Sequence, residues 1–142
     1  MKIIQVIYSF EVGGIESLIL ELSNKLDKKK YEFHLLILTN DNIRMTKLLD
    51  KEVIVHTLPI RANELKTIFG MFKCFFGLCN VLKDVQPNII HTHLTSLPLL
   101  FISTAIKFAS RHSINTRTVH TAGIFYDNQE GLKNKIKLWA EK

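Results

Sequence analysis

Apolar residues in this chain are grouped into short runs and helical stripes that alternate along the sequence. Apolar side chains fill most of positions 2–8, which predicts a strand covered on both faces, as in a parallel sheet. The next segment has the spacing of an amphipathic helix packed against that strand, with the stripe Ile15, Leu18, Ile19, Leu22 and Leu26. The chain therefore begins with a strand and a helix, joined by a turn that contains Gly13 and Gly14.

The same alternation continues along the rest of the chain. Further strands are predicted over 32–38, 53–58, 89–92 and 116–120, with helices over 43–49, 64–84 and 99–109 between them. Strands that alternate with helices predict an α/β fold with a parallel sheet of about five strands and right-handed crossovers.

The predicted helix over 64–84, for which Asn63 is the expected N-cap, carries more apolar residues than a sheet can cover. Its main stripe is Leu65, Ile68, Phe69, Phe72, Phe75, Phe76, Cys79 and Leu82, and Met71, Cys74, Leu78 and Val81 widen it. The outer face is left to Lys66, Gly70, Lys73, Gly77 and Asn80. The surplus fits contact with a membrane surface, contact with a second domain, or burial on most sides. A spanning helix is not expected, because Lys73 lies in the middle of a short apolar run.

Composition narrows the class of protein and of partner. The 142 residues suit one domain with a real core. The net charge of +6, mostly from lysine, suits an anionic partner such as a phosphorylated ligand or an acidic lipid surface. No nucleic-acid partner is expected, because no basic stripe is interleaved with aromatic residues. Two cysteines, Cys74 and Cys79, predict reduced thiols in a cytoplasmic protein, and the start of the chain does not resemble a secretory signal.

The Gly13-Gly14 turn is the first candidate for ligand contact. Without side chains there, backbone N–H groups and the positive end of the helix can approach a phosphate or another polar ligand. Glu16 follows in the first helical turn, where an acidic residue is favoured by the helix dipole. The third glycine of the dinucleotide-binding fingerprint is missing. A tight turn required only for packing therefore remains an equal alternative.

Three of the six histidines, His34, His56 and His112, fall in strands or connections without carboxylate or cysteine neighbours. Packing or solvent exposure is expected for them. His91 and His93 lie two residues apart at the end of a strand and share a face, but no third ligand is evident, so no metal is expected.

His120 is expected to end the fifth strand, just before a loop that contains Gly123. Ligands of open α/β sheets bind beyond the carboxyl ends of the strands, near the point where strand order reverses. The Gly13-Gly14 turn, His93 and His120 are all predicted at that edge, which favours a binding site there.

Three segments carry a family resemblance: KIIQVIYSFEVGGIESLILELSNKL, PNIIHTH and TRTVHTAG. Together they resemble the N-terminal domain of family 4 glycosyltransferases, of the kind that build bacterial surface polysaccharides. The resemblance spans essentially the whole chain. It implies one half of the GT-B architecture, in which two Rossmann-like domains face each other across a cleft. This half would be a single Rossmann-like domain with strand order 3-2-1-4-5 and helices on both faces.

The resemblance also implies a chemistry. Such enzymes transfer a sugar with retention, without a metal or cofactor, from a nucleotide donor, here expected to be UDP-linked, to a lipid-linked or growing polysaccharide acceptor. Gly13 and Gly14 would lie against the donor phosphates and the acceptor, with Glu16 starting the helix behind them. His120 would contact the transferred sugar as the catalytic residue, and His93 would shape the cleft. The residues expected to bind the acceptor are Thr95, Ser96, Thr121 and Gly123.

The family's donor-binding C-terminal domain is expected to lie outside residues 1–142, since the sequence stops within a predicted amphipathic helix that starts at Leu132. The chain alone is therefore expected to be inactive, and attached peripherally to the inner face of the membrane through residues 64–84. One alternative is a non-catalytic subunit that binds acceptor and membrane and completes a split enzyme with a separate chain. Another is a nucleotide-binding regulatory domain, which would bind nucleotide by itself.

Overall fold

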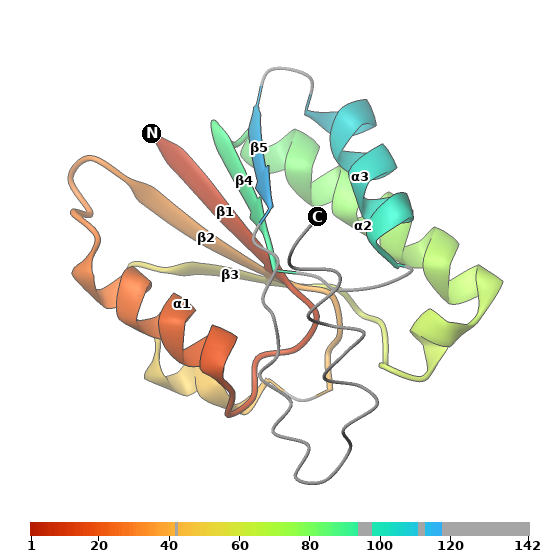
Figure 1. Cartoon of the computed structure of the whole chain (residues 1–142), viewed down its shortest axis with the longest axis horizontal. Coiled ribbons are helices and arrows are strands. Elements are labelled where there is room, and N and C mark those ends of the chain that lie inside the picture. Colours follow the sequence, from red (N-terminus) through yellow and green to blue (C-terminus); the bar gives the residue numbers. More distant parts are fainter. Residues whose placement is uncertain (42, 94–97, 111–112, 118–142) are drawn as a thin grey trace, which may run out of the picture.

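Five parallel strands form one sheet in the computed structural model, which describes residues 1–41, 43–93, 98–110 and 113–117 (Figure 1). The order is β3-β2-β1-β4-β5, as predicted. The strands are β1 (Lys2–Ile7), β2 (Glu32–Ile37), β3 (Ile54–Thr57), β4 (Ile89–Thr92) and β5 (Ile114–Arg117). At the centre, Val6 of β1 is in register with Leu36 of β2 and Thr92 of β4.

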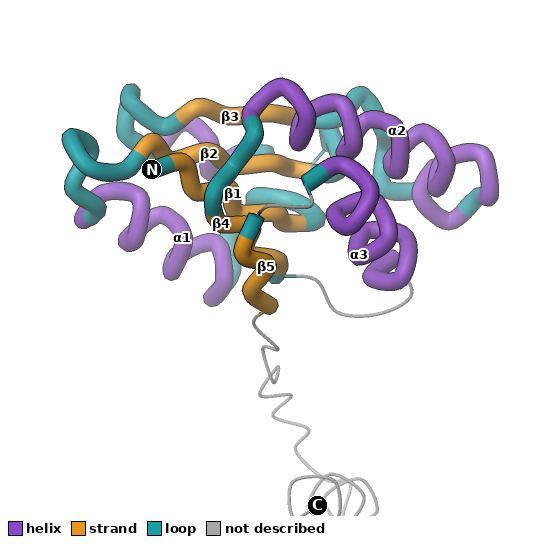
Figure 2. The backbone as a smooth tube through the Cα atoms, turned by 90° about the horizontal axis from the view of Figure 1, so that it is seen from above, coloured by secondary structure: helices purple, strands orange, loops and turns teal. Residues whose placement is uncertain are grey.

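Helices cover both faces of the sheet, as predicted (Figure 1). Helix α1 (Gly14–Lys25) packs on one face, where Ile19 joins a core with Phe33 and Leu35. Helices α2 (Ile68–Val85) and α3 (Pro98–Ala109) lie side by side on the other face, as Figure 2 also shows, with Leu78 and Leu82 in the core. Two short 3-10 helices, η1 (Arg44–Leu48) and η2 (Glu64–Lys66), complete the connections.

Helix α1 buries a narrower face than its apolar stripe predicts. Ile19 and Ser23 face the sheet, whereas Leu18 and Leu22, predicted to pack there, are exposed. The buried hydroxyl of Ser23 donates to the carbonyl oxygen of Leu20 at 2.8 Å, so it can occupy a core position without an unpaired polar group. Ser23 is thus buried against the sheet because it is small and its hydroxyl is hydrogen-bonded, although its polarity alone would predict a surface position.

The predicted single helix over 64–84 is broken at Thr67, so the assignment of Asn63 as N-cap is wrong for the long helix. Residues Glu64–Lys66 form η2, and α2 starts only after Thr67, whose hydroxyl oxygen accepts from the N–H of Gly70 at 3.0 Å. Thr67 is therefore the N-cap of α2.

The face of α2 that packs on the sheet also differs from the prediction. The buried residues are Gly70, Cys74, Leu78, Cys79, Leu82 and Val85, whereas Ile68, Phe69, Phe72 and Phe76 of the predicted main stripe are exposed. Gly70 and Gly77, predicted on the outer face, lie inside: Gly70 is buried, and Gly77 faces the side chain of Leu58. Small residues let α2 approach its neighbours closely, and the large side chains turn outward.

Strand β5 starts two residues earlier than the predicted strand over 116–120 and ends, in the described residues, at Arg117. Its start is fixed by β4, since Ile114 is in register with Ile89 and its N–H donates to the carbonyl oxygen of Asn88 at 2.8 Å. The sequence before it is polar and gives no apolar signal for a strand. Residues 118–120 lie outside the described part of the chain.

Both cysteines are free, in agreement with the reduced thiols predicted, and both are buried. Burial raises the pKa of the Cys74 thiol to about 11 and also raises that of Cys79. Neither side chain is therefore a ready thiolate nucleophile at neutral pH.

The expectation that His34 and His56 have no carboxylate neighbour is wrong. The Nε2 atom of His34 lies 2.9 Å from Oε1 of Glu32, and its Nδ1 atom lies 3.0 Å from Nε2 of His56. Glu32 is two residues before His34 on the same strand and therefore shares its face. His56 reaches the pair through the pairing of β2 with β3.

Candidate functional site

The candidate site lies at the carboxyl edge of the sheet, between β1 and β4. Strand order reverses between these two neighbours, because β2 and β3 follow on one side and β5 on the other. The Gly13-Gly14 turn follows β1, and His93 follows β4 directly, with its N–H donating to the carbonyl oxygen of Val6 at 2.9 Å. The structure thus places the glycine turn and His93 at one edge, beside the switch point where open α/β sheets bind ligands.

The glycine turn leaves open space at the start of α1. Gly13 has extended backbone angles that any residue adopts, with φ of −164°. A Cβ atom on Gly13 would lie 2.2 Å from Oε2 of Glu16, at the end of a flexible side chain, and one on Gly14 would meet nothing within 4 Å. Since neither backbone angles nor packing requires glycine at position 14, its presence favours ligand access over the packing alternative.

Replacing Gly14 by alanine tests this interpretation. The protein is expected to fold with unchanged or slightly higher stability, because alanine is about 1 kcal/mol more favourable than glycine within a helix. Any turnover that depends on this turn is expected to fall about tenfold, because the added methyl group would fill space that a ligand needs in order to approach the backbone. Melting temperature and steady-state kinetics measure the two effects. A stable variant with normal kinetics would assign Gly14 no ligand role.

His93 is a buried imidazole held in a fixed orientation. Its Nε2 atom lies 2.5 Å from Oε1 of Gln5, which is itself buried on β1. Its ring packs against that of His91, with centroids 4.1 Å apart. Gln5 was not predicted as part of the site, although one polar residue within an otherwise apolar strand was a signal for it. This contact joins β1 to the end of β4, so His93 can shape the floor of the site.

Hydrogen bonds tie together the loops after the first three strands. The buried hydroxyl of Thr39 donates to the carbonyl oxygen of Tyr8 at 3.1 Å. The carboxylate of Asp41 accepts the N–H of Ala62 at 3.0 and 3.1 Å, which lowers the pKa of Asp41. Tyr8 donates to the carbonyl oxygen of Ala62 at 3.3 Å, and its pKa is raised by burial and then by Asp41. These hydrogen bonds hold the loops after β1, β2 and β3 in fixed positions beside the glycine turn.

Two arginines near this edge already have acidic neighbours. Nε of Arg44 lies 3.6 Å from a carboxylate oxygen of Glu11, and the charge of Arg61 helps to lower the pKa of Asp41. Their charges are partly compensated. For an anionic ligand, the exposed start of α1, with its backbone N–H groups and helix dipole, offers the more open approach.

Several predicted site residues lie outside the described residues: Thr95, Ser96, His120, Thr121 and Gly123. Within the described residues, no three His, Cys, Asp or Glu side chains are grouped so that they could hold a metal ion. None of the helices in that same part of the chain is both long and apolar enough to cross a membrane.

A family model described as Glycosyltransferase Family 4 matches residues 12–142, which include the glycine turn, His93 and all five predicted site residues outside the described part. No curated protein matches the chain.

Proposed function

Because the chain belongs to glycosyltransferase family 4, we propose that it is the acceptor-side half of a retaining glycosyltransferase. The enzyme moves a sugar from a UDP-linked donor to a lipid-linked or growing surface polysaccharide. The bond between the anomeric carbon and the diphosphate oxygen breaks and its electron pair leaves with UDP. A bond to the acceptor oxygen forms, and the hydroxyl proton of the acceptor passes to the departing UDP or to water. The proposal rests chiefly on the position of the glycine turn and His93 beside the strand-order switch.

Roles for individual residues follow from this placement. The backbone at Gly13 and Gly14 faces the donor phosphates and the acceptor, with Glu16 in the first turn behind it. Gln5 holds His93 as part of the cleft wall. His120 contacts the transferred sugar. The proposed acceptor contacts are Thr95, Ser96, Thr121 and Gly123.

The donor-binding half is proposed to lie outside residues 1–142. Donor-side charges that stabilise the leaving diphosphate supply much of the rate enhancement in such a transfer. Purified chain 1–142 is therefore expected to release no UDP above background from a panel of UDP-sugars mixed with bacterial membrane lipids. Adding the donor-binding domain should restore release. Release by the chain alone would contradict the proposal.

Two further measurements separate the alternatives. Calorimetric titration with UDP is expected to show weak binding, and tight binding by this chain alone would favour a nucleotide-binding regulatory domain. Sequencing the gene beyond the codon for Lys142 distinguishes one enzyme with two domains from a split enzyme whose donor half is a separate chain.

An exposed apolar surface on α2 supports peripheral attachment to the cytoplasmic face of a membrane. We define the phenylalanine patch as Ile68, Phe69, Phe72 and Phe76, which are 72%, 80%, 52% and 61% exposed. Exposed Lys66 adjoins it and would attract anionic lipids. Exposed Lys73 also adjoins it, but its charge is partly compensated by Glu64, whose Oε2 atom lies 3.7 Å from Nζ. The patch occupies the first half of α2, which follows the loop at the carboxyl end of β3 and covers the face of the sheet opposite α1 (Figure 1). A bilayer held there would lie toward the edge of the sheet that carries the candidate site.

A further inference from the structure

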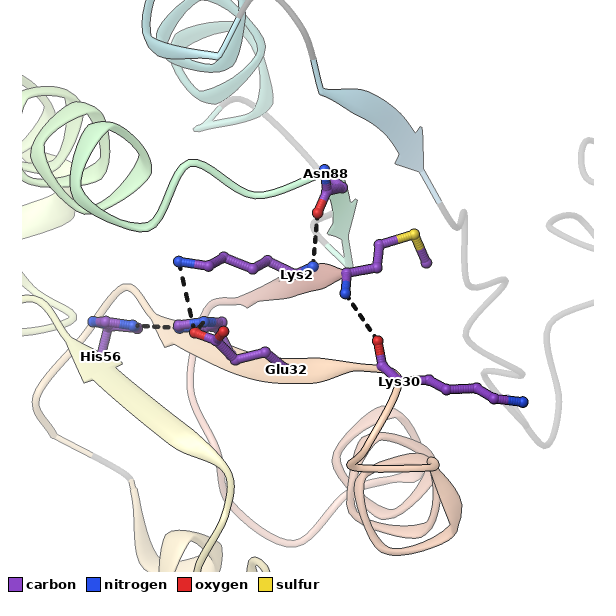
Figure 3. Close-up of polar contacts among 7 residues, drawn as sticks. Lys2, Lys30, Glu32, His56 and Asn88 are labelled. Atoms are coloured by element: carbon purple, nitrogen blue, oxygen red, sulfur yellow. Dashed lines mark hydrogen bonds and ion pairs between the residues drawn. The ribbon is translucent and has the colours of Figure 1, made fainter.

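Two histidines and a glutamate form a hydrogen-bonded chain that connects β2 to β3, outside the candidate site between β1 and β4 (Figure 3). The imidazole of His34 stands in the middle, bonded to Glu32 through Nε2 and to His56 through Nδ1. The rings are stacked with centroids 5.3 Å apart and planes 13° from parallel. His34 is buried, His56 is half-buried and Glu32 is exposed. We call these side chains the histidine chain.

The bonding pattern limits how many protons the histidine chain can hold. The ionised carboxylate of Glu32 only accepts, so His34 donates through Nε2–H. In the neutral pair, Nδ1 of His34 accepts from Nε2–H of His56. One further proton fits, either on Nδ1 of His56 or shared between the rings, because a single hydrogen still lies between the facing nitrogens. A second would place two N–H groups against each other across 3.0 Å and two cations in stacked rings.

Charges on β1, at the amino terminus and on α2 face this group. Lys2 of β1 lies 3.7 Å from Glu32, and the amino group of Met1 also acts on that carboxylate. The pKa of Glu32 is lowered, chiefly by the hydrogen bond with His34. From the last turn of α2, Asp84 favours a charge on His56. Burial and then the charge of His34 outweigh it and lower the pKa of His56.

We propose that the histidine chain binds one proton, resists a second, and so makes the attachment of β3 to the sheet sensitive to pH. In the described sheet β3 pairs only with β2, so it is an edge strand without a second neighbour. The chain after β3 continues to Ala62, whose N–H donates a hydrogen bond to the carboxylate of Asp41 beside the candidate site. Repulsion between two cationic rings would therefore act on β3, and the loop after β3 helps to hold the edge of the sheet that carries the candidate site.

The direction of the pH effect follows from the lowered pKa of His56. Below the ordinary histidine value of about 6.5, the unfolded chain binds more protons at this position than the folded protein does. Its contribution to stability is complete above that value and is lost as pH falls through the lowered folded value. The contribution of Glu32 has the same direction but is lost only below about pH 4.5, where its unfolded form takes up a proton.

NMR titration of the histidine rings in the ¹⁵N-labelled full chain, from pH 8 to 4.5, tests the proposal. The ring signals of His56 are expected to shift with a midpoint below the ordinary histidine value of about 6.5, because burial disfavours its charge and a second added proton would bring two N–H groups together across the hydrogen bond to His34. Urea unfolding of His56→Gln at pH 7 and pH 5 should show a smaller loss of stability on acidification than urea unfolding of the unmodified protein does. His112→Gln, which removes a histidine from outside this group, is the matched control and should change neither result.

Two outcomes would overturn the proposal. One is a titration midpoint at or above pH 6.5 for the ring of His56 in the unmodified protein. The other is an unchanged difference in stability between pH 7 and pH 5 in His56→Gln. Because His56 is only half-buried and glutamine can keep a hydrogen bond to His34, this variant is expected to fold.

Discussion

Replacing Phe69, Phe72 and Phe76 together by serine is expected to weaken binding of the chain to anionic vesicles about 100-fold. Each ring is already exposed in the folded protein, so its loss removes little core packing. Partial burial of an aromatic ring in the interfacial region stabilises the bound state by about 1 kcal/mol, and three rings together account for about a hundredfold change in affinity. The melting temperature should change by only a few degrees.

Co-sedimentation with vesicles that contain phosphatidylglycerol measures this effect, and phosphatidylcholine vesicles report the part due to charge. Leu48→Ser is the matched control, since Leu48 is 62% exposed in η1, whose Met45 packs in the core on the α1 face. Its binding should equal that of the unmodified chain. Unchanged binding by the triple variant would refute membrane contact through α2. A large fall in melting temperature would instead identify the rings as core residues.

The architecture could be predicted because parallel strands covered on both faces are continuous apolar runs. The segments that became β1 and β2 are such runs, and the segments between strands have a different, helical period. Alternation of the two patterns leaves few possible topologies once right-handed crossovers are required. The strand order was therefore predictable, whereas the ends of the fifth strand and the single helix over 64–84, which is broken at Thr67, had to be corrected.

The packed faces of the helices could not be predicted from polarity. In α2 the apolar arc is so wide that several faces of the helix have the same periodicity. The buried face is the one that contains Gly70 and Cys74, because these small residues let α2 approach its neighbours closely. In α1 the small hydroxyl residue Ser23 is buried and Leu22 is not. Periodicity measures polarity, whereas packing also depends on volume and on backbone distance.

The edge that carries the candidate site was predictable in outline, but its supporting contacts were not. A glycine turn and a strand-ending His93 can be recognised in sequence, and topology then brings them together. The contact between Gln5 and His93 joins residues 88 positions apart, and that between Asp41 and Ala62 depends on the shape of two loops. Contacts of this kind depend on strand register and on loop shape, which the identity of a single residue does not reveal.

Gly70→Ala is expected to destabilise the protein by about 3 kcal/mol, because Gly70 allows η2 to fold back onto the start of α2. A Cβ atom at this position would lie 1.9 Å from the carbonyl oxygen of Glu64 and 2.4 Å from its carbonyl carbon. These are backbone atoms, so the turn itself must move, and the overpacking outweighs the gain of about 1 kcal/mol in helix propensity.

Gly77→Ala is the matched control in the same helix. Its Cβ atom would lie 3.0 Å from a methyl group at the flexible end of Leu58, so its stability should change by less than about 1 kcal/mol. Urea unfolding measures both variants, and equal stabilities would contradict the role assigned to Gly70. Displacing η2 should also shift Thr67, which caps α2, so loss of vesicle binding by Gly70→Ala at temperatures where it stays folded would connect this turn to the placement of the phenylalanine patch.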